Sequence, residues 1–248
     1  MSFSIYSQTM KHVNIFCLPF AGGNKYSYRP LRWQEYGLNM IGLDYPGRGG
    51  RIADPLMDDL GMIANDLCRI LGSQDLGDDY LLYGHSMGGI VGFELIHRLA
   101  EAGIKPPVHF VVTGTTAPSC TRRSERNWHH LPKPAFIRKL RELNGFPDEV
   151  LADPDMFDFI EPIIRADFKA LECYQYEKRL PLSVPITIIT GTDEDIGGEE
   201  ITAWQKETTQ RVDFLKMNGN HFFIFDTERN NIPKLLSERL TTPKIYSL

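Results

Sequence analysis

The sequence predicts an α/β protein in which a mostly parallel sheet is covered by helices on both faces. Two observations favour this class. Apolar runs of strand length alternate along the chain with stretches whose apolar residues recur every three or four positions. In addition, 42% of the 248 residues are hydrophobic and 24% are charged, a balance typical of a globular protein with a sizeable core.

Each expected strand is a short, mostly apolar run bounded by turn residues. Strands are expected at residues 13–18, 38–43, 80–83, 108–113, 186–190 and 212–216. Apolar residues at helical spacing predict helices in four further stretches, at residues 29–36, 56–71, 90–103 and 232–240. Gly72 suits the end of the second of these helices.

The regular alternation breaks between residues 117 and 183, where no strand is convincing. Helical patterns occur there at residues 134–143 and 155–176, and prolines interrupt them. Because roughly 65 residues are too many for a plain connection, we expect a helical lid at about residues 118–183, inserted between late core strands of a single domain spanning residues 1–248. Most of its large apolar residues should form the lid's own core, while some could line a pocket: Trp128, Phe136, Phe146, Met156, Phe157, Phe159 and Phe168.

Composition and charge exclude several classes of protein. The net charge of −5 and the pI of about 5.8 argue against a nucleic-acid partner. The longest apolar runs are too short to span a membrane, and the polar residues 1–12 give no indication of export. The cysteines show neither metal-ligand spacing nor a disulfide framework, so we expect a cytoplasmic protein without a metal. They are Cys17, Cys68, Cys120 and Cys173.

One glycine-rich turn carries the strongest chemical signal. Residues 84–88 read Gly-His-Ser-Met-Gly and connect the expected strand at 80–83 to an expected helix. The pattern G-x-S-x-G in this context is typical of a nucleophile elbow, in which the serine stands at the tip of a sharp turn. Without that context the pattern is more often a chance match. We therefore expect Ser86 to be a nucleophile, with Gly84 and Gly88 required by the tightness of the turn.

A serine hydroxyl needs a neighbouring base, and the base needs an acid. His221 directly follows the last expected strand, which is the chain position that such a base occupies. The acid is expected on the loop after the strand at 186–190, where three candidates stand in a row. The residues alone do not choose among Asp193, Glu194 and Asp195.

An acyl-transfer site also needs hydrogen-bond donors for the oxyanion. The backbone N–H of Met87, just after the expected nucleophile, would supply one donor. The N–H of Ala21, on the loop after the first strand, would supply the other. The alternative for this loop is an ordinary tight turn at Gly22 and Gly23.

Taken together, these motifs resemble the type II thioesterases that accompany non-ribosomal peptide and polyketide synthases, which are members of the α/β-hydrolase superfamily. The resemblance covers nearly the whole chain. It rests on Leu-Pro-Phe-Ala-Gly-Gly at 18–23, Tyr-Pro-Gly-Arg-Gly at 45–49 with Arg51, Gly-His-Ser-Met-Gly-Gly at 84–89, Arg-Ala-Asp-Phe at 165–168, Trp204, and Gly-Asn-His-Phe at 219–222.

The resemblance implies an α/β-hydrolase fold and a substrate in which an acyl group is linked as a thioester to the phosphopantetheine arm of a carrier protein. It implies no cofactor, because the substrate itself brings the phosphopantetheine, and nothing demands an oligomer. The family uses an aspartate as the acid, which favours Asp193 or Asp195, although the family's spacing from Gly191 falls on Glu194. Arg48 could meet an acidic carrier or a phosphate, or be a solvated loop charge, and the same holds for Arg51.

Two other classes remain open at this stage. The same triad would serve a carboxylesterase or a small lipase, because it acts on esters and thioesters alike. A binding module that keeps the fold without the chemistry is the second alternative. Such a module would normally have lost a member of the triad, whereas all three positions can be filled here.

Overall fold

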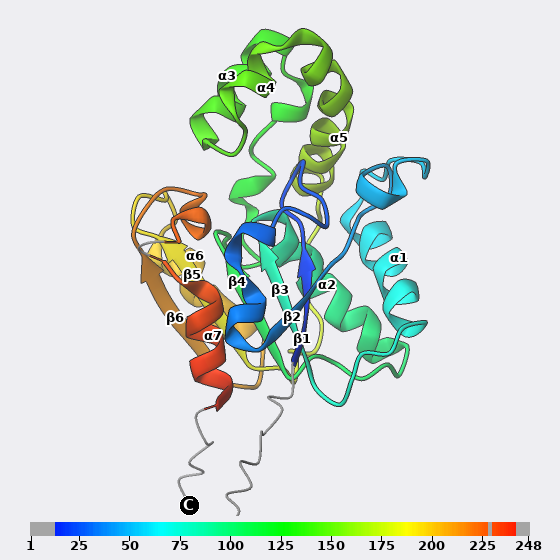
Figure 1. The fold of residues 1–248 in the computed structure, drawn as a ribbon, viewed down its shortest axis with the longest axis vertical. Helices are drawn as coiled ribbons and strands as arrows, with labels where there is room; N and C mark the ends of the chain where they lie inside the picture. Colours follow the sequence, from blue (N-terminus) through cyan, green and yellow to red (C-terminus); the bar gives the residue numbers. More distant parts are fainter. Residues whose placement is uncertain (1–12, 228–229, 242–248) are drawn as a thin grey trace, which may run out of the picture.

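The computed structural model describes residues 13–227 and 230–241, so the polar segment 1–12 lies outside the described residues. Its centre is a sheet of six parallel strands in the order β2-β1-β3-β4-β5-β6 (Figure 1). The strands are β1 (Val13–Leu18), β2 (Leu38–Gly42), β3 (Tyr80–His85), β4 (His109–Thr113), β5 (Ile186–Gly191) and β6 (Val212–Met217). The predicted parallel α/β class is therefore confirmed, and each expected strand is found within two residues of its predicted ends.

Helices cover both faces of the sheet, as the alternation predicts. Side chains of α1 (Leu60–Gly72) and α2 (Met87–Glu101) pack with one face of the strands into the larger apolar core. Trp204, from the short helices that include α6 (Gly198–Thr202), joins the same core. On the opposite face, α7 (Ile232–Thr241) and Trp33, from a 3-10 helix, pack against β1 and its neighbours. The inner strands β1, β3, β4 and β5 are mostly buried on both sides, which explains why their segments are largely apolar, whereas the edge strands β2 and β6 are partly exposed and carry polar residues.

Helix α1 begins four residues later than its apolar spacing suggests. The side chain of Asp59 accepts a hydrogen bond from the backbone N–H of Met62, which is the arrangement of an N-cap. The cap sets the start at Leu60, and the preceding residues remain in the loop. The expected helix at 29–36 is instead two short 3-10 helices, because Arg32 between them adopts a left-handed conformation with φ of 52°.

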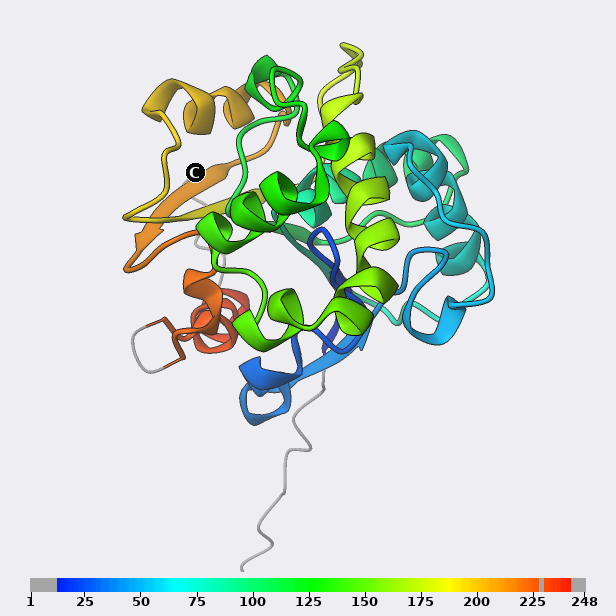
Figure 2. The same ribbon diagram turned by 90° about the horizontal axis from the view of Figure 1, so that it is seen from above.

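The long segment between β4 and β5, residues 114–185, is helical, and we call it the helical insertion. It contains α3 (Lys133–Leu143), α4 (Asp148–Ala152) and α5 (Pro154–Glu172). These helices lie above one end of the sheet in Figure 1 and across that end in Figure 2. They pack around a separate small core that includes Phe136, Leu140, Phe157, Ile164 and Phe168. The helices α4 and α6 were not expected, because five residues are too few to show a helical period.

Two chemical features can be stated for the described residues as a group. No helix among them combines the length and the apolar character needed to cross a bilayer. Within the same residues, no group of three or more His, Cys, Asp or Glu side chains is arranged to hold a metal ion.

Candidate active site

The sharp turn from β3 into α2 places Ser86 at the carboxyl edge of the sheet. Ser86 has φ of 53° and ψ of −117°, a conformation that L-residues seldom adopt and that marks functional sites. A Cβ at Gly84 would lie 2.2 Å from the carbonyl oxygen of Gly88, and a Cβ at Gly88 would lie 2.3 Å from that of Leu18. These contacts are the steric reason for the two glycines of the motif. The strained serine is held by its N–H, which donates to the carbonyl of Thr113 at 2.8 Å.

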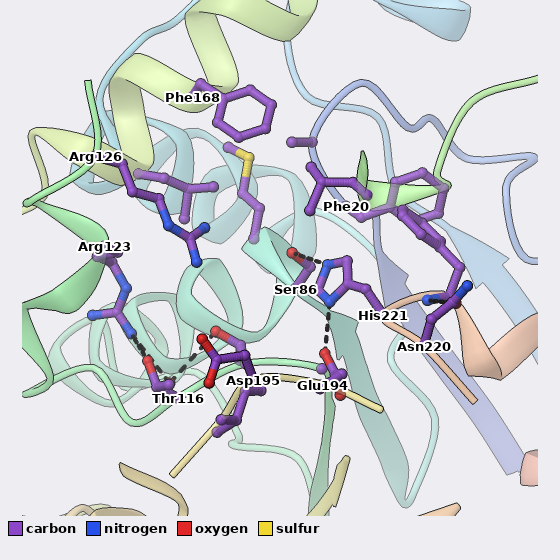
Figure 3. A pocket seen from close by; sticks show the side chains of 18 of the residues that line it. Phe20, Ser86, Thr116, Arg123, Arg126, Phe168, Glu194, Asp195, Asn220 and His221 are labelled. Carbon is purple, nitrogen blue, oxygen red and sulfur yellow. Dashed lines mark hydrogen bonds and ion pairs between the residues drawn. The ribbon is translucent and has the colours of Figure 1, made fainter. Parts of the chain in front are cut away.

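Three side chains from distant segments meet at this edge (Figure 3). The Oγ of Ser86 lies 3.0 Å from Nε2 of His221, which is within hydrogen-bond distance. On the other side of the ring, Nδ1 of His221 lies 2.7 Å from Oε1 of Glu194. Because an ionised carboxylate only accepts hydrogen bonds, this contact places the proton on Nδ1 and leaves Nε2 free to accept the serine proton. The geometry is that of a nucleophile, a base and an orienting acid.

The carboxylate that contacts His221 belongs to Glu194, so the expectation that Asp193 or Asp195 takes this position is wrong. The backbone of the turn decides this: the N–H of Gly191 donates to Oε2 of Glu194 at 2.7 Å, and the N–H of Asp193 donates to the carbonyl of Gly219 at 3.0 Å. Glu194 is thereby directed inward, with its side chain only 3% exposed. The Asp195 side chain is 91% exposed and pairs with Arg122. Asp193 is exposed and accepts a hydrogen bond from the hydroxyl of Thr192.

His85, next to the nucleophile, is buried beside the triad and does not join it. Its ring centre lies 4.9 Å from that of His221, and its Nδ1 lies 2.9 Å from Oγ1 of Thr113. Burial, together with the neighbouring His221, lowers the pKa of His85 well below the usual value for histidine. A neutral ring therefore packs against His221. The sequence alone does not indicate this supporting position.

The two expected oxyanion donors, Met87 and Ala21, line the same pocket as Ser86. The loop that carries Ala21 is fixed at its next residue, since the N–H of Gly22 donates to Oδ2 of Asp167 at 2.7 Å. Asp167 belongs to α5, so a side chain of the helical insertion holds this loop. Gly22 has φ of +78°, and a Cβ there would lie 2.7 Å from the ring of Phe146.

Asp167 also forms a buried ion pair with Arg48, with contacts of 2.5 and 2.6 Å between the guanidinium and the carboxylate. Both side chains are at most 3% exposed. Arg48 is therefore neither a solvated loop charge nor available to a carrier or a phosphate, and that expectation is wrong. Arg51 is paired as well, with Asp54 and Asp66. The partners stand up to 119 residues away in the sequence, so the spacing of the motif does not show them.

A pocket of about 340 Å³ lies in front of Ser86. Its wall combines core loops with the helical insertion, which contributes Phe146 and Phe168 among others. The remaining aromatic residues of the insertion do not line it. Phe136 and Phe157 are buried in the insertion's own core, and Phe159 is exposed.

A strained serine after β3, an imidazole after β6 and a carboxylate after β5, all at one edge of a parallel sheet, define a serine hydrolase site of the α/β-hydrolase class. The family model for the thioesterase domain matches residues 13–240, and the chain belongs to that family.

Individual relatives share most of their length with this chain. It is 30% identical to the gramicidin S biosynthesis protein GrsT of Aneurinibacillus migulanus, over 87% of this chain and 84% of that protein. It is 35% identical to a Brevibacillus parabrevis protein named linear gramicidin dehydrogenase LgrE, over 86% and 82%. Among solved structures, the type II thioesterase BorB from the borrelidin biosynthetic cluster matches with a TM-score of 0.80 and 30% identity, over 92% of each chain.

Proposed function

We propose that this protein is an editing, type II thioesterase that hydrolyses acyl thioesters from the phosphopantetheine arm of carrier protein domains in non-ribosomal peptide or polyketide biosynthesis. The observation that carries the proposal is the Ser86–His221–Glu194 chain facing a pocket in a member of the thioesterase family. Relatives named for gramicidin S and borrelidin biosynthesis support the choice of substrate. Removal of stalled or wrong acyl groups would return the carrier to use.

The reaction follows from the positions of the three side chains. Nε2 of His221 takes the proton as Oγ of Ser86 attacks the thioester carbonyl, and the N–H groups of Met87 and Ala21 bind the oxyanion. The tetrahedral intermediate expels the pantetheine sulfur, which receives the proton from His221, and the acyl group remains on Ser86. A water that gives its proton to His221 then attacks the acyl-enzyme and releases the carboxylic acid. Glu194 holds the imidazole and stabilises the imidazolium, so no metal or cofactor is required.

The name of one relative and the general chemistry of the triad raise the question of other functions. The relative LgrE is named a dehydrogenase, but the groups that face one another in this chain are a hydroxyl, an imidazole and a carboxylate, which suit acyl transfer. An ester rather than a thioester substrate would use the same triad. A comparison of an acylated carrier with a short p-nitrophenyl ester separates these functions, and a clear preference for the simple ester would contradict our proposal.

The direct test is mass spectrometry of several acylated carriers before and after incubation with the protein. We expect the wild type to remove the acyl group and Ser86→Ala to leave it in place. Ser73→Ala is a matched control, because Ser73 is exposed at the end of α1 and its hydroxyl only bonds the carbonyl of Ile70. Full cellular function of Ser86→Ala would instead support a non-catalytic binding module.

A further inference from the structure

The pocket in front of Ser86 contains several carboxylates, and each has a partner of its own. Glu194 binds His221, Asp195 binds Arg122, and Asp193 accepts from Thr192. The two carboxylates that the helical insertion contributes to the pocket also have partners. Glu142 pairs with Lys139 at 2.6 Å, and Glu172 accepts from the backbone N–H groups of Trp128 and His129 and contacts the His129 ring.

Three arginines line the same pocket, and two of them lack a carboxylate partner among the described residues. Arg122 pairs with Asp195. Arg123 is buried and gives its Nη hydrogen bonds to uncharged oxygens of residues 116–120. The Arg126 side chain makes no hydrogen bond or ion pair within the described chain, and its guanidinium carbon lies 4.9 Å from the ring centre of Trp128. The carboxylates of Glu172, Glu200 and Asp195 act on it from a longer distance. Of these two, Arg126 is therefore the one whose guanidinium has no hydrogen-bond acceptor among the described residues.

The surroundings of these two guanidinium groups disfavour their charge. Burial lowers the pKa of Arg123. Arg126 is an exposed residue, yet desolvation around its guanidinium lowers its pKa and repulsion from Arg122 adds to this effect, while attraction from Glu172, Glu200 and Asp195 offsets only part of it. An anion in the pocket would relieve this cost, because an opposite charge within a few ångströms stabilises the charged form.

Figure 3 shows where such an anion would lie. Arg126 extends into the pocket from the side of Ser86 opposite His221, while Arg123 points toward Thr116. Apolar side chains line the same pocket, among them Leu143, Phe168 and Ile196. The pocket thus offers apolar walls for a chain and a cation for the group that the chain carries.

We propose that Arg126 binds a carboxylate on the acyl group, so that the enzyme prefers acyl chains that carry an acidic group. This inference rests on the proposed thioesterase function and names its substrate class. The phosphate of the carrier arm offers the same anionic oxygens, but it lies at the far end of the long pantetheine arm. The acyl group begins at the carbonyl that Ser86 attacks, and a cation in the pocket beside Ser86 suits the acyl group better.

The test compares acidic acyl thioesters with neutral ones of equal shape. Succinyl, glutaryl and adipyl thioesters are each paired with the corresponding primary amide, on pantetheine and on phosphopantetheine. The variants are Arg126→Gln, Arg126→Lys and the control Arg138→Gln, since Arg138 is an exposed arginine of α3 that does not line the pocket. Steady-state kcat and KM are measured for each combination, and binding of the pantetheine thioesters to Ser86→Ala is measured by calorimetry.

We expect the wild type to prefer at least one acidic chain over its amide. Arg126→Gln should reduce that preference about 10- to 100-fold, mainly through KM, because a hydrogen bond to a charged group is lost. Arg126→Lys should restore part of it, and Arg138→Gln should keep it. The phosphate should leave the preference unchanged.

Three results would overturn the inference. An unchanged preference in Arg126→Gln removes the role of the arginine, and equal use of acid and amide by the wild type removes the substrate class. If Arg126→Gln weakens the use of phosphopantetheine substrates but not of pantetheine substrates, whether the acyl chain is an acid or an amide, the arginine binds the phosphate of the carrier arm instead. If the wild type hydrolyses none of these thioesters, the proposed function fails for them, and the calorimetry still decides whether the pocket prefers the acidic chain.

Discussion

The assignment of Glu194 as the acid can be tested by changing the three carboxylates of its loop one at a time. Glu194→Gln keeps the shape of the side chain and removes its charge. In the structure one carboxylate oxygen faces Nδ1 of His221 and the other accepts from the N–H of Gly191, both at 2.7 Å. Whichever way the amide is turned, its NH₂ group faces one of these two donors. One buried donor is then opposed by another, and the imidazolium loses its counterion.

The magnitude follows from these contacts. A neutral amide at this position allows the wrong imidazole tautomer, and in serine proteases the equivalent change lowers kcat about 10⁴-fold. We expect a loss of about 10³- to 10⁴-fold for Glu194→Gln. Glu194→Asp retains the charge but withdraws the carboxylate by one methylene, and a misplacement of about 1 Å costs about 100-fold. Asp193→Asn and Asp195→Asn change exposed charges and should remain within about twofold of the wild type.

The assay is hydrolysis of one acylated carrier, followed by mass spectrometry at several substrate concentrations. A circular dichroism spectrum and a urea unfolding curve of each variant separate a catalytic loss from a folding defect. The reasoning is refuted if Asp195→Asn or Asp193→Asn loses most of the activity while Glu194→Gln retains it. That result would mean that the loop rearranges when substrate binds.

Two further predictions concern buried groups beside the site. Asp167→Asn leaves the Arg48 charge without a counterion, so the free energy of unfolding should fall by about 3 to 5 kcal/mol in urea titrations, and a loss below about 1 kcal/mol would contradict the buried pair. For His85, the unfolded chain gains a proton as the pH falls below the usual pKa of 6.5, while the buried ring does not. Wild-type stability therefore has a contribution that is present above pH 6.5 and declines below it, and its advantage over His85→Gln should shrink by up to about 1.4 kcal/mol per pH unit, measured by urea unfolding between pH 7.5 and 5. A parallel pH dependence of the two proteins would show that His85 is not the group responsible.

Much of this architecture is predictable from the sequence, because local patterns determine it. Buried parallel strands are apolar along their whole length, and the turn at 84–88 carries its own steric requirements, so both are visible in short segments. The chain positions of Ser86 and His221 follow from the order of the strands, since the carboxyl ends of parallel strands share one edge of the sheet.

The acid and the arginines were not predictable in the same way. Which of three consecutive carboxylates faces inward depends on hydrogen bonds from Gly191 and to Gly219, and Gly219 comes from a different part of the chain. Arg48 looks like an exposed loop residue until its partner on α5 is known. Ion pairs between residues distant in the sequence determine whether such charged side chains are buried, and a short sequence pattern does not reveal them.

The position of Asp167 has a practical consequence for protein engineering. Its carboxylate binds both Arg48 and the backbone N–H of Gly22, so the helical insertion cannot be exchanged independently of the core loops beneath it. A chimera that takes its helical insertion from a relative will place the Ala21 amide correctly only if that insertion has a carboxylate at the position of Asp167 and the rest of the chain retains Arg48. Redesign of acyl selectivity in this scaffold should therefore begin with single side chains on the cavity wall.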